Sequence, residues 1–220
     1  MTSVNNTGQN EEHTGNQLFP VFLKLNELHT ALIGAGNVGL EKLTAILNNS
    51  NSAKVTVIAR EVLPEMFYLS KGFPSVNILQ KSFEAADLDA ADIVVAATDD
   101  SELNKQIRQA AKERKLLINV ADKPELCDFY LGSVVKKGDL KLGISTNGKS
   151  PTVAKRIKEV LNTALPDELN ITLQQVNDLR NTLTGDFANK VKELNRITAM
   201  LSAKDNNQEH NTPLSENTAR

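Results

Sequence analysis

The feature of this sequence that most constrains its fold is a glycine-rich turn, Gly34–Gly39 (GAGNVG), between two regular patterns. The apolar run His29–Ile33 before the turn is typical of a strand, and Leu40–Asn49 after it has helical spacing. A second apolar run, Lys54–Ala59, follows about 20 residues later. The glycines alone would be a weak signal, but in this strand–turn–helix context they predict a dinucleotide-binding unit.

Each glycine of the turn has an expected part in holding a pyrophosphate. Gly34 allows the tight turn, Gly36 lets the phosphates approach the backbone, and Gly39 permits close packing of the helix on the strand. The N–H groups of Asn37 and Val38 open the helix, where the helix dipole favours negative charge. A glycine-rich turn without a ligand is the alternative, which the complete fingerprint disfavours.

Strand-like and helix-like segments alternate along the first half of the chain. A short strand is expected at Leu18–Leu23, before the glycine turn. After the second apolar run we expect a helix, two strands, a helix and a strand: Leu63–Lys71, Val76–Leu79, Asp92–Ala97, Ser101–Arg114 and Leu116–Val120. The alternation predicts an α/β fold, a Rossmann-like, doubly wound parallel sheet.

The residues after the second strand are expected to choose between NAD and NADP. Glu61 would accept hydrogen bonds from a ribose diol and repel a 2′-phosphate, which favours NAD. Arg60 would instead favour NADP, because its guanidinium could accommodate that phosphate. We expect NAD, with a pair of solvated loop charges as the alternative.

The pattern changes after residue 125. Phe129–Lys136 and Leu140–Thr146 flank a turn and indicate a β-hairpin. Ser150 and Pro151 then begin a helix as N-cap and first helical residue, and further helical patterns follow. The expected parts are a disordered leader (1–17), an NAD-binding Rossmann domain (18–125), a hairpin dimerisation element (126–149), a helical substrate and dimer region (150–203) and a disordered tail (204–220).

Composition excludes several other classes of function. A net charge of −2, 4% aromatic residues and no Trp argue against a nucleic-acid binder. No apolar run approaches the roughly 20 residues of a membrane span, and the N-terminus does not resemble a secretory signal. The single cysteine, Cys127, rules out an intrachain disulfide and suits a reducing cytoplasm. With three His and no cluster of ligand spacing, no protein-bound metal is expected.

Candidate catalytic groups must lie at the carboxyl ends of the strands. Thr98, Asp99 and Asp100 follow one buried strand, and Asp122 follows the next. A carboxylate at Asp122 would lie beside the nicotinamide and could take a proton from the substrate. A turn or cap residue is the alternative for Asp122, and caps of the next helix are the preferred interpretation of Asp99 and Asp100.

A second candidate site is the loop between the hairpin and the following helix. Hydroxyls, backbone N–H groups and a lysine at a helix N-terminus could together hold carboxylates. Ordinary helix capping beside a solvated basic face is the alternative. The loop residues are Ser145, Thr146, Asn147, Gly148 and Lys149.

Five sequence blocks follow one another along the chain: LFPVFLKL, ALIGAGNVGLEK, DIVVAATDDSELN, LINVADKPELCDFYLGSVV and LKLGISTNGKSP. Together, over about Leu18 to Leu165, they resemble the precorrin-2 dehydrogenase and sirohydrochlorin ferrochelatase family in its free-standing form. The resemblance implies oxidation of precorrin-2 by NAD⁺ to sirohydrochlorin, NADH and a proton. It also implies an intertwined homodimer. Some members of the family insert Fe²⁺ as well and others are dehydrogenases only, so both alternatives stay open for this chain.

The resemblance assigns roles to particular residues. The family's catalytic aspartate falls on Asp122, and its NAD contacts fall on Asn37-Val38 and Arg60-Glu61. Its double-serine loop falls on Ser145-Thr146, where Thr replaces the second Ser and Asn147 replaces a Gly.

A regulatory module is the alternative from a different class of function. The NAD-sensing domains attached to potassium transporters also carry a glycine turn, and AATDDSELN is similar to a segment of them. Such a module would finish its sheet with another βα unit, which the hairpin and the STNGKSP loop argue against.

Overall fold

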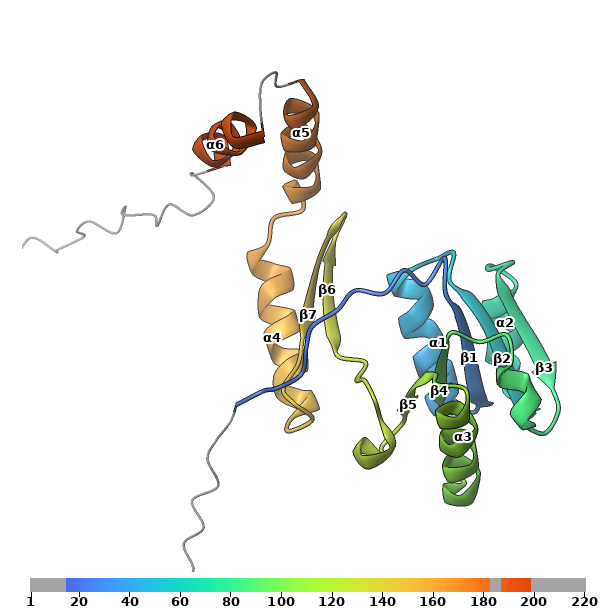
Figure 1. The fold of residues 1–220 in the computed structure, drawn as a ribbon. Helices are drawn as coiled ribbons and strands as arrows, with labels where there is room; N and C mark the ends of the chain where they lie inside the picture. Colours follow the sequence, from blue (N-terminus) through green and yellow to red (C-terminus); the bar gives the residue numbers. More distant parts are fainter. Residues whose placement is uncertain (1–14, 183–186, 199–220) are drawn as a thin grey trace, which may run out of the picture. The chain divides into compact units, whose positions relative to one another are not determined.

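The computed structural model describes residues 15–182 and 187–198, which fall into two compact units (Figure 1). One unit extends to residue 134 and includes 143–158; the other comprises 135–142 and the chain from 159 onwards. The expected disordered leader and tail fall largely on residues 1–14 and 199–220, which lie outside the described residues.

A five-stranded parallel sheet in the order β3-β2-β1-β4-β5 forms the centre of the first unit. Its strands are β1 (His29–Ala35), β2 (Lys54–Val62), β3 (Val76–Gln80), β4 (Ile93–Ala96) and β5 (Leu117–Val120). The connections contain α1 (Asn37–Asn49), α2 (Pro64–Ser70), the 3₁₀ turn η1 (Ala85–Leu88) and α3 (Ser101–Glu113). The predicted Rossmann-like fold is therefore confirmed.

Helices lie on both faces of this sheet (Figure 1), and alternate residues of the central strands belong to two different apolar clusters. Ile33 of β1 belongs to the apolar cluster that contains Ile107 of α3. Its neighbour Leu32 belongs to the cluster that contains Leu43 of α1. All of β4 is buried because helices cover both faces, and this explains the continuous apolar run in its sequence.

The chain continues through a 3₁₀ turn, a hairpin and three helices. The bounds are η2 (Pro124–Leu126), β6 (Ser133–Lys137), β7 (Leu140–Ile144), α4 (Pro151–Ala164), α5 (Leu169–Thr182) and α6 (Phe187–Thr198). β6 and β7 form a separate two-stranded sheet, so the predicted hairpin is confirmed, and its turn contains Gly138 with φ of +57°. Among the described residues, no helix combines the length and the hydropathy that a membrane crossing requires.

Two expected strands differ from the structure. The strand predicted at Leu18–Leu23 is wrong, because residues 15–24 form no helix or strand and Phe19 is 85% exposed. An apolar run without a neighbouring strand gains no ladder hydrogen bonds, and Pro20 has no N–H to donate. The first hairpin strand begins at Ser133, not at Phe129, because the segment before it lies along β5, with Asp128 N–H donating to the Ile118 carbonyl at 2.8 Å.

Candidate functional site

The three glycines of the turn have different surroundings. A Cβ on Gly34, whose φ is +105°, would lie 2.3 Å from the carbonyl oxygen of Ala97, and one on Gly39 would lie 2.2 Å from that of Gly34. Such distances are far inside van der Waals contact, so these two positions exclude a side chain. At Gly36 nothing beyond its chain neighbours lies within 4 Å of the Cβ position. The turn is therefore tightly packed at its first and third glycines and open at the second.

The start of α1 faces this opening. Gly36 is the N-cap, no side chain caps the helix, and the first turn contains no acidic residue. Asn37 and Val38 are exposed. Because the first N–H groups of a helix have no partner within the helix, this end of α1 can donate to an anion, and the helix dipole adds to the attraction.

The strand order places the turn where ligands bind in open α/β sheets. β1 pairs with β2 on one side and β4 on the other, so the connections leave in opposite directions at this point. Ala97 N–H donates to the Ile33 carbonyl at 2.7 Å, and Ala121 N–H donates to the Ala96 carbonyl at 2.9 Å. These bonds tie the carboxyl ends of β1, β4 and β5 together.

Thr98 lies two residues after the end of β4 and takes part in a partly buried polar contact. Its hydroxyl donates to Asn104 Oδ1 at 2.9 Å, and Asn104 Nδ2 donates to the Thr98 carbonyl at 3.0 Å. Asp100 is the N-cap of α3 and accepts from two backbone N–H groups at 3.0 Å. The capping interpretation is therefore confirmed for Asp100, whereas Asp99 is not the N-cap.

Arg60 and Glu61 lie within β2, because that strand ends at Val62 and not at Ala59 as expected. The register shifts here: Ile33 pairs with Ile58, but Ala35 pairs with Val62. This irregularity accommodates the extra residues of β2. The side chains of Arg60 and Glu61 are both exposed, on the strand that pairs with β1.

Asp122 lies in the turn after β5, with its backbone in the left-handed region at φ of +57°. The turn alternative is thus correct for its backbone. Its exposed carboxylate accepts no hydrogen bond from the part of the chain that the structure describes. The side chain therefore remains available to a ligand.

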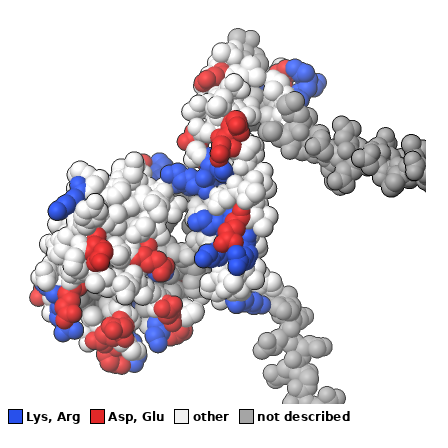
Figure 2. All heavy atoms as spheres, turned by 180° about the vertical axis from the view of Figure 1, so that it is seen from behind, with Lys and Arg blue, Asp and Glu red and all other residues white. Residues whose placement is uncertain are grey.

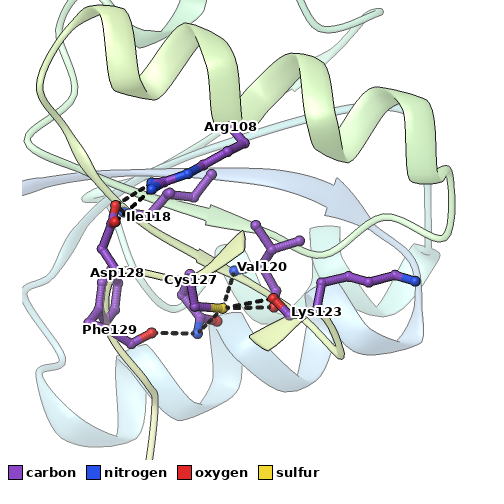
Figure 3. A network of polar contacts seen from close by, with 8 residues as sticks. Arg108, Ile118, Val120, Lys123, Cys127, Asp128 and Phe129 are labelled. Carbon is purple, nitrogen blue, oxygen red and sulfur yellow. Dashed lines mark hydrogen bonds and ion pairs between the residues drawn. The ribbon is translucent and has the colours of Figure 1, made fainter. Parts of the chain in front are cut away.

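A network of polar contacts next to Asp122 was not anticipated from the sequence (Figure 3). Arg108 of α3 donates to both carboxylate oxygens of Asp128, one bond measuring 2.8 Å. This ion pair holds the pKa of Asp128 below its usual value. Cys127 also contacts β5, where its sulfur accepts from the Val120 N–H at 3.2 Å, and burial raises the pKa of its thiol. The 20-residue separation of Arg108 and Asp128 leaves no local sequence signal.

The second candidate loop is held largely by its own residues. Asn147 and Gly148 have φ of +53° and +73°, and Lys149 N–H donates to the Thr146 carbonyl at 3.0 Å. Ser145 Oγ accepts from Asn147 N–H at 3.2 Å. Lys149 is exposed. Within the described residues, no hydrogen bond or ion pair joins this loop to the glycine turn or to Asp122.

The helix after this loop begins as the sequence predicts. Ser150 Oγ accepts from Val153 N–H at 3.2 Å, which confirms the capping interpretation for Ser150, and Pro151 is the first residue of α4. Across residues 15–182 and 187–198, no group of three or more His, Cys, Asp and Glu side chains is arranged to hold a metal ion.

The sheet, its open glycine turn and the exposed start of α1 define the class: a Rossmann-like dinucleotide-binding protein. The chain belongs to the family described as putative NAD(P)-binding, whose model matches residues 21–133. A second model, described as the central part of sirohaem biosynthesis proteins, matches residues 137–162. These two matches confirm the resemblance stated from the sequence blocks.

Curated relatives and a solved structure agree with this family. The chain is 34% identical to a siroheme synthase of Thioalkalivibrio sulfidiphilus, over 67% of this chain and 30% of that protein. It is 32% identical to one of Methylococcus capsulatus, over 73% of this chain and 33% of that protein. It thus spans about a third of these relatives. A structure titled SirC, precorrin-2 dehydrogenase, matches with a TM-score of 0.67 and 25% identity, over 82% of this chain and 89% of that chain. None of these matches supports the alternative of a sensing module.

Proposed function

We propose that this protein oxidises precorrin-2 to sirohydrochlorin with NAD⁺, as a step of sirohaem biosynthesis. One observation carries the proposal: an open glycine turn at the β1–β4 switch point and the exposed, unpartnered carboxylate of Asp122 after β5 lie at the same, carboxyl edge of the parallel sheet. The likeness to the structure titled precorrin-2 dehydrogenase, over most of both chains, supports the choice of substrate.

The parts of the coenzyme site follow from the geometry of the glycine turn. The backbone at Gly36, Asn37 and Val38 would hold the diphosphate, since a Cβ position without neighbours and uncapped N–H groups leave room and donors for it. Gly34 and Gly39 would keep the turn packed on the sheet, and Thr98 would contact the nicotinamide half. Glu61 would accept from the ribose diol, with Arg60 beside it.

The reaction removes a hydride and a proton from precorrin-2. NAD⁺ supplies the hydride acceptor when it is bound. Asp122 would take the proton, because its carboxylate is exposed and bonded to no described group. Precorrin-2 is a polycarboxylate, and the loop from Ser145 through Thr146, Asn147 and Gly148 to Lys149 would bind its carboxylates. The exposed lysine and the hydroxyls of that loop support this role.

The proposal includes a homodimer in the cytoplasm and, as a second reaction, insertion of Fe²⁺ as a substrate. Apolar side chains of α4 that a monomer leaves exposed, above all Val160 at 66%, support the dimer. Iron insertion requires a base to deprotonate the pyrrole nitrogens. Asp122 would be that base, because its carboxylate has no partner among the described residues.

An assay with precorrin-2 tests the proposal directly. Purified protein, precorrin-2 and NAD⁺ are combined without oxygen, and NADH fluorescence and tetrapyrrole absorption are followed together. We expect one NADH for each sirohydrochlorin formed, and no change when NAD⁺ is omitted. Binding of NAD⁺ without NADH formation would instead identify a sensing module. Adding Fe²⁺ or Co²⁺ to the finished reaction tests metal insertion through the absorption of the metallated product.

A further inference from the structure

The outer edge of β5 is covered by two side chains where another strand could have paired. β5 is the last strand of the sheet, so the N–H groups along its outer edge have no neighbouring strand. Val120 N–H donates to Cys127 Sγ at 3.2 Å, and Ile118 N–H donates to Asp128 Oδ2 at 3.1 Å. Figure 3 shows both contacts side by side along the strand.

These side chains close the loop that contains Asp122. Cys127 Sγ lies 3.2 Å from the Val120 carbonyl and 3.3 Å from the Lys123 carbonyl, one residue on either side of the turn at 121–122 (Figure 3). Burial raises the pKa of this thiol, so the S–H is retained at neutral pH and can donate to a carbonyl.

Asp128 binds the C-terminal end of the same loop to β5 and to α3. Its carboxylate is bound by Arg108 of α3, and its N–H donates to the Ile118 carbonyl at 2.8 Å. The loop is therefore tied to β5 at Val120 and Ile118, and through Arg108 to a helix that packs on the sheet.

The backbone of Asp122 needs such support. A non-glycine residue in the left-handed region is disfavoured by its own Cβ and persists only where its surroundings fix it. The carboxylate itself makes no bond with the described residues that would fix its direction. The backbone of the turn therefore sets the direction of the Cα–Cβ bond from which the carboxylate extends.

We propose that Cys127 and Asp128 are positioning residues for Asp122, and that their bonds to Val120, Lys123 and Ile118 aim its carboxylate at the substrate. The inference rests on the proposed function of Asp122. Neither residue acts on a reacting atom. Their effect on turnover passes through the geometry of the turn, where a displacement of about 1 Å can cost about 100-fold in rate.

The variants Cys127→Ala and Cys127→Ser separate this role from general stability. Alanine removes every bond of the sulfur, whereas the serine hydroxyl can still accept from Val120 and donate to a carbonyl. We expect Cys127→Ala to lower kcat by about tenfold, with KM and the Kd for NAD⁺ within about twofold of wild type. Cys127→Ser should regain most of the loss. An unchanged kcat for Cys127→Ala, or a serine variant as slow as the alanine one, overturns the proposal.

Hydrogen exchange provides a measurement that needs no activity. The Val120 amide, which the thiol protects, should exchange at least about tenfold faster in Cys127→Ala and return toward wild type in Cys127→Ser. Faster exchange with unchanged kcat overturns the positioning role and leaves the proposed function intact. Absence of precorrin-2 oxidation by wild-type protein overturns the proposed function and the catalytic consequence with it, while the exchange data still decide whether the thiol holds the turn. Unchanged exchange overturns the structural part of the inference.

Discussion

Two aspartates near the end of β5 have opposite surroundings, although only five residues lie between them. Asp122 is exposed and bound by nothing that the structure describes, whereas Asp128 is held by Arg108 and by a backbone N–H of β5. A proton acceptor must have lone pairs available to the substrate, and a structural carboxylate must not. The structure therefore divides the two tasks between the two residues.

Asp122→Ala should lower kcat for precorrin-2 oxidation by at least about 100-fold, the usual contribution of a positioned general base. The Kd for NAD⁺ should stay within about twofold, because the glycine turn is unchanged. Steady-state kinetics and coenzyme titration measure both quantities. Glu125→Ala, which removes an exposed carboxylate from the same loop, is the matched control and should keep its rate. A near-normal rate for Asp122→Ala would show that this residue is not the base.

Asp128 should make stability depend on pH in acid. Its pKa in the folded chain is lowered by Arg108, so the unfolded state binds the proton more tightly. The stabilisation is complete above the unfolded pKa of about 3.9 and is lost as the pH falls through the lower, folded pKa. Asp128→Asn keeps the shape but not the charge. It should cost about 1 kcal/mol of unfolding free energy at pH 7.

Urea denaturation at several pH values tests this expectation. The difference in unfolding free energy between wild type and Asp128→Asn should shrink steadily below about pH 4. A difference that stays constant down to pH 2 would mean that the Arg108 pair does not stabilise the fold through charge.

At the scale of elements, the turn between β1 and α1 uses glycine for two different reasons: packing of the backbone and access for a ligand. Gly34 and Gly39 are needed because the backbone of neighbouring segments occupies the space of a Cβ. Gly36 lies where that space is open, so folding alone does not require a glycine there. Its absent side chain matters when a diphosphate approaches.

Alanine substitutions at two of these glycines should separate folding from binding. Gly34→Ala forces a Cβ to 2.3 Å from a carbonyl oxygen at φ of +105° and should lower the unfolding free energy by about 2 kcal/mol or more. Gly36→Ala, at φ of −81°, should change it by less than about 1 kcal/mol yet weaken NAD⁺ binding by more than about tenfold. Thermal unfolding and calorimetric titration provide the two readouts. Unweakened binding by Gly36→Ala would place the diphosphate elsewhere.

These elements also show what the sequence can and cannot predict. The glycine turn and the buried strand β4 were predictable because their signals are local: glycine spacing, and an apolar run that a covered strand requires. The covered edge of β5 was not, since the bond from Val120 to Cys127 depends on where the chain returns after a turn. The strand predicted at Leu18–Leu23 was wrong because an apolar segment has the same sequence pattern whether or not a strand lies beside it.

At the scale of the whole molecule, the charges and the apolar surface indicate what the protein associates with. In Figure 2, acidic and basic side chains are scattered over the larger rounded unit, while blue side chains lie closer together, with red ones among them, on the other part. The apolar surface is more concentrated. Along α4, Val153, Ile157 and Val160 are exposed at the spacing of one helix face.

That exposed face leads to a prediction about assembly. A second copy of the chain would bury the stripe of Val153, Ile157 and Val160, so the wild type should sediment as a dimer. Val160→Asp places a charge within the stripe, where burial without a partner costs several kcal/mol, and should weaken the dimer by at least about 100-fold. Lys155→Asp alters the charge even more but on the opposite side of α4, about 200° around the helix from Val153, and should leave the dimer intact. Analytical ultracentrifugation over a concentration series compares the three proteins, with circular dichroism to verify that α4 remains folded. Equal dissociation constants for wild type and Val160→Asp would place the subunit contact on another surface.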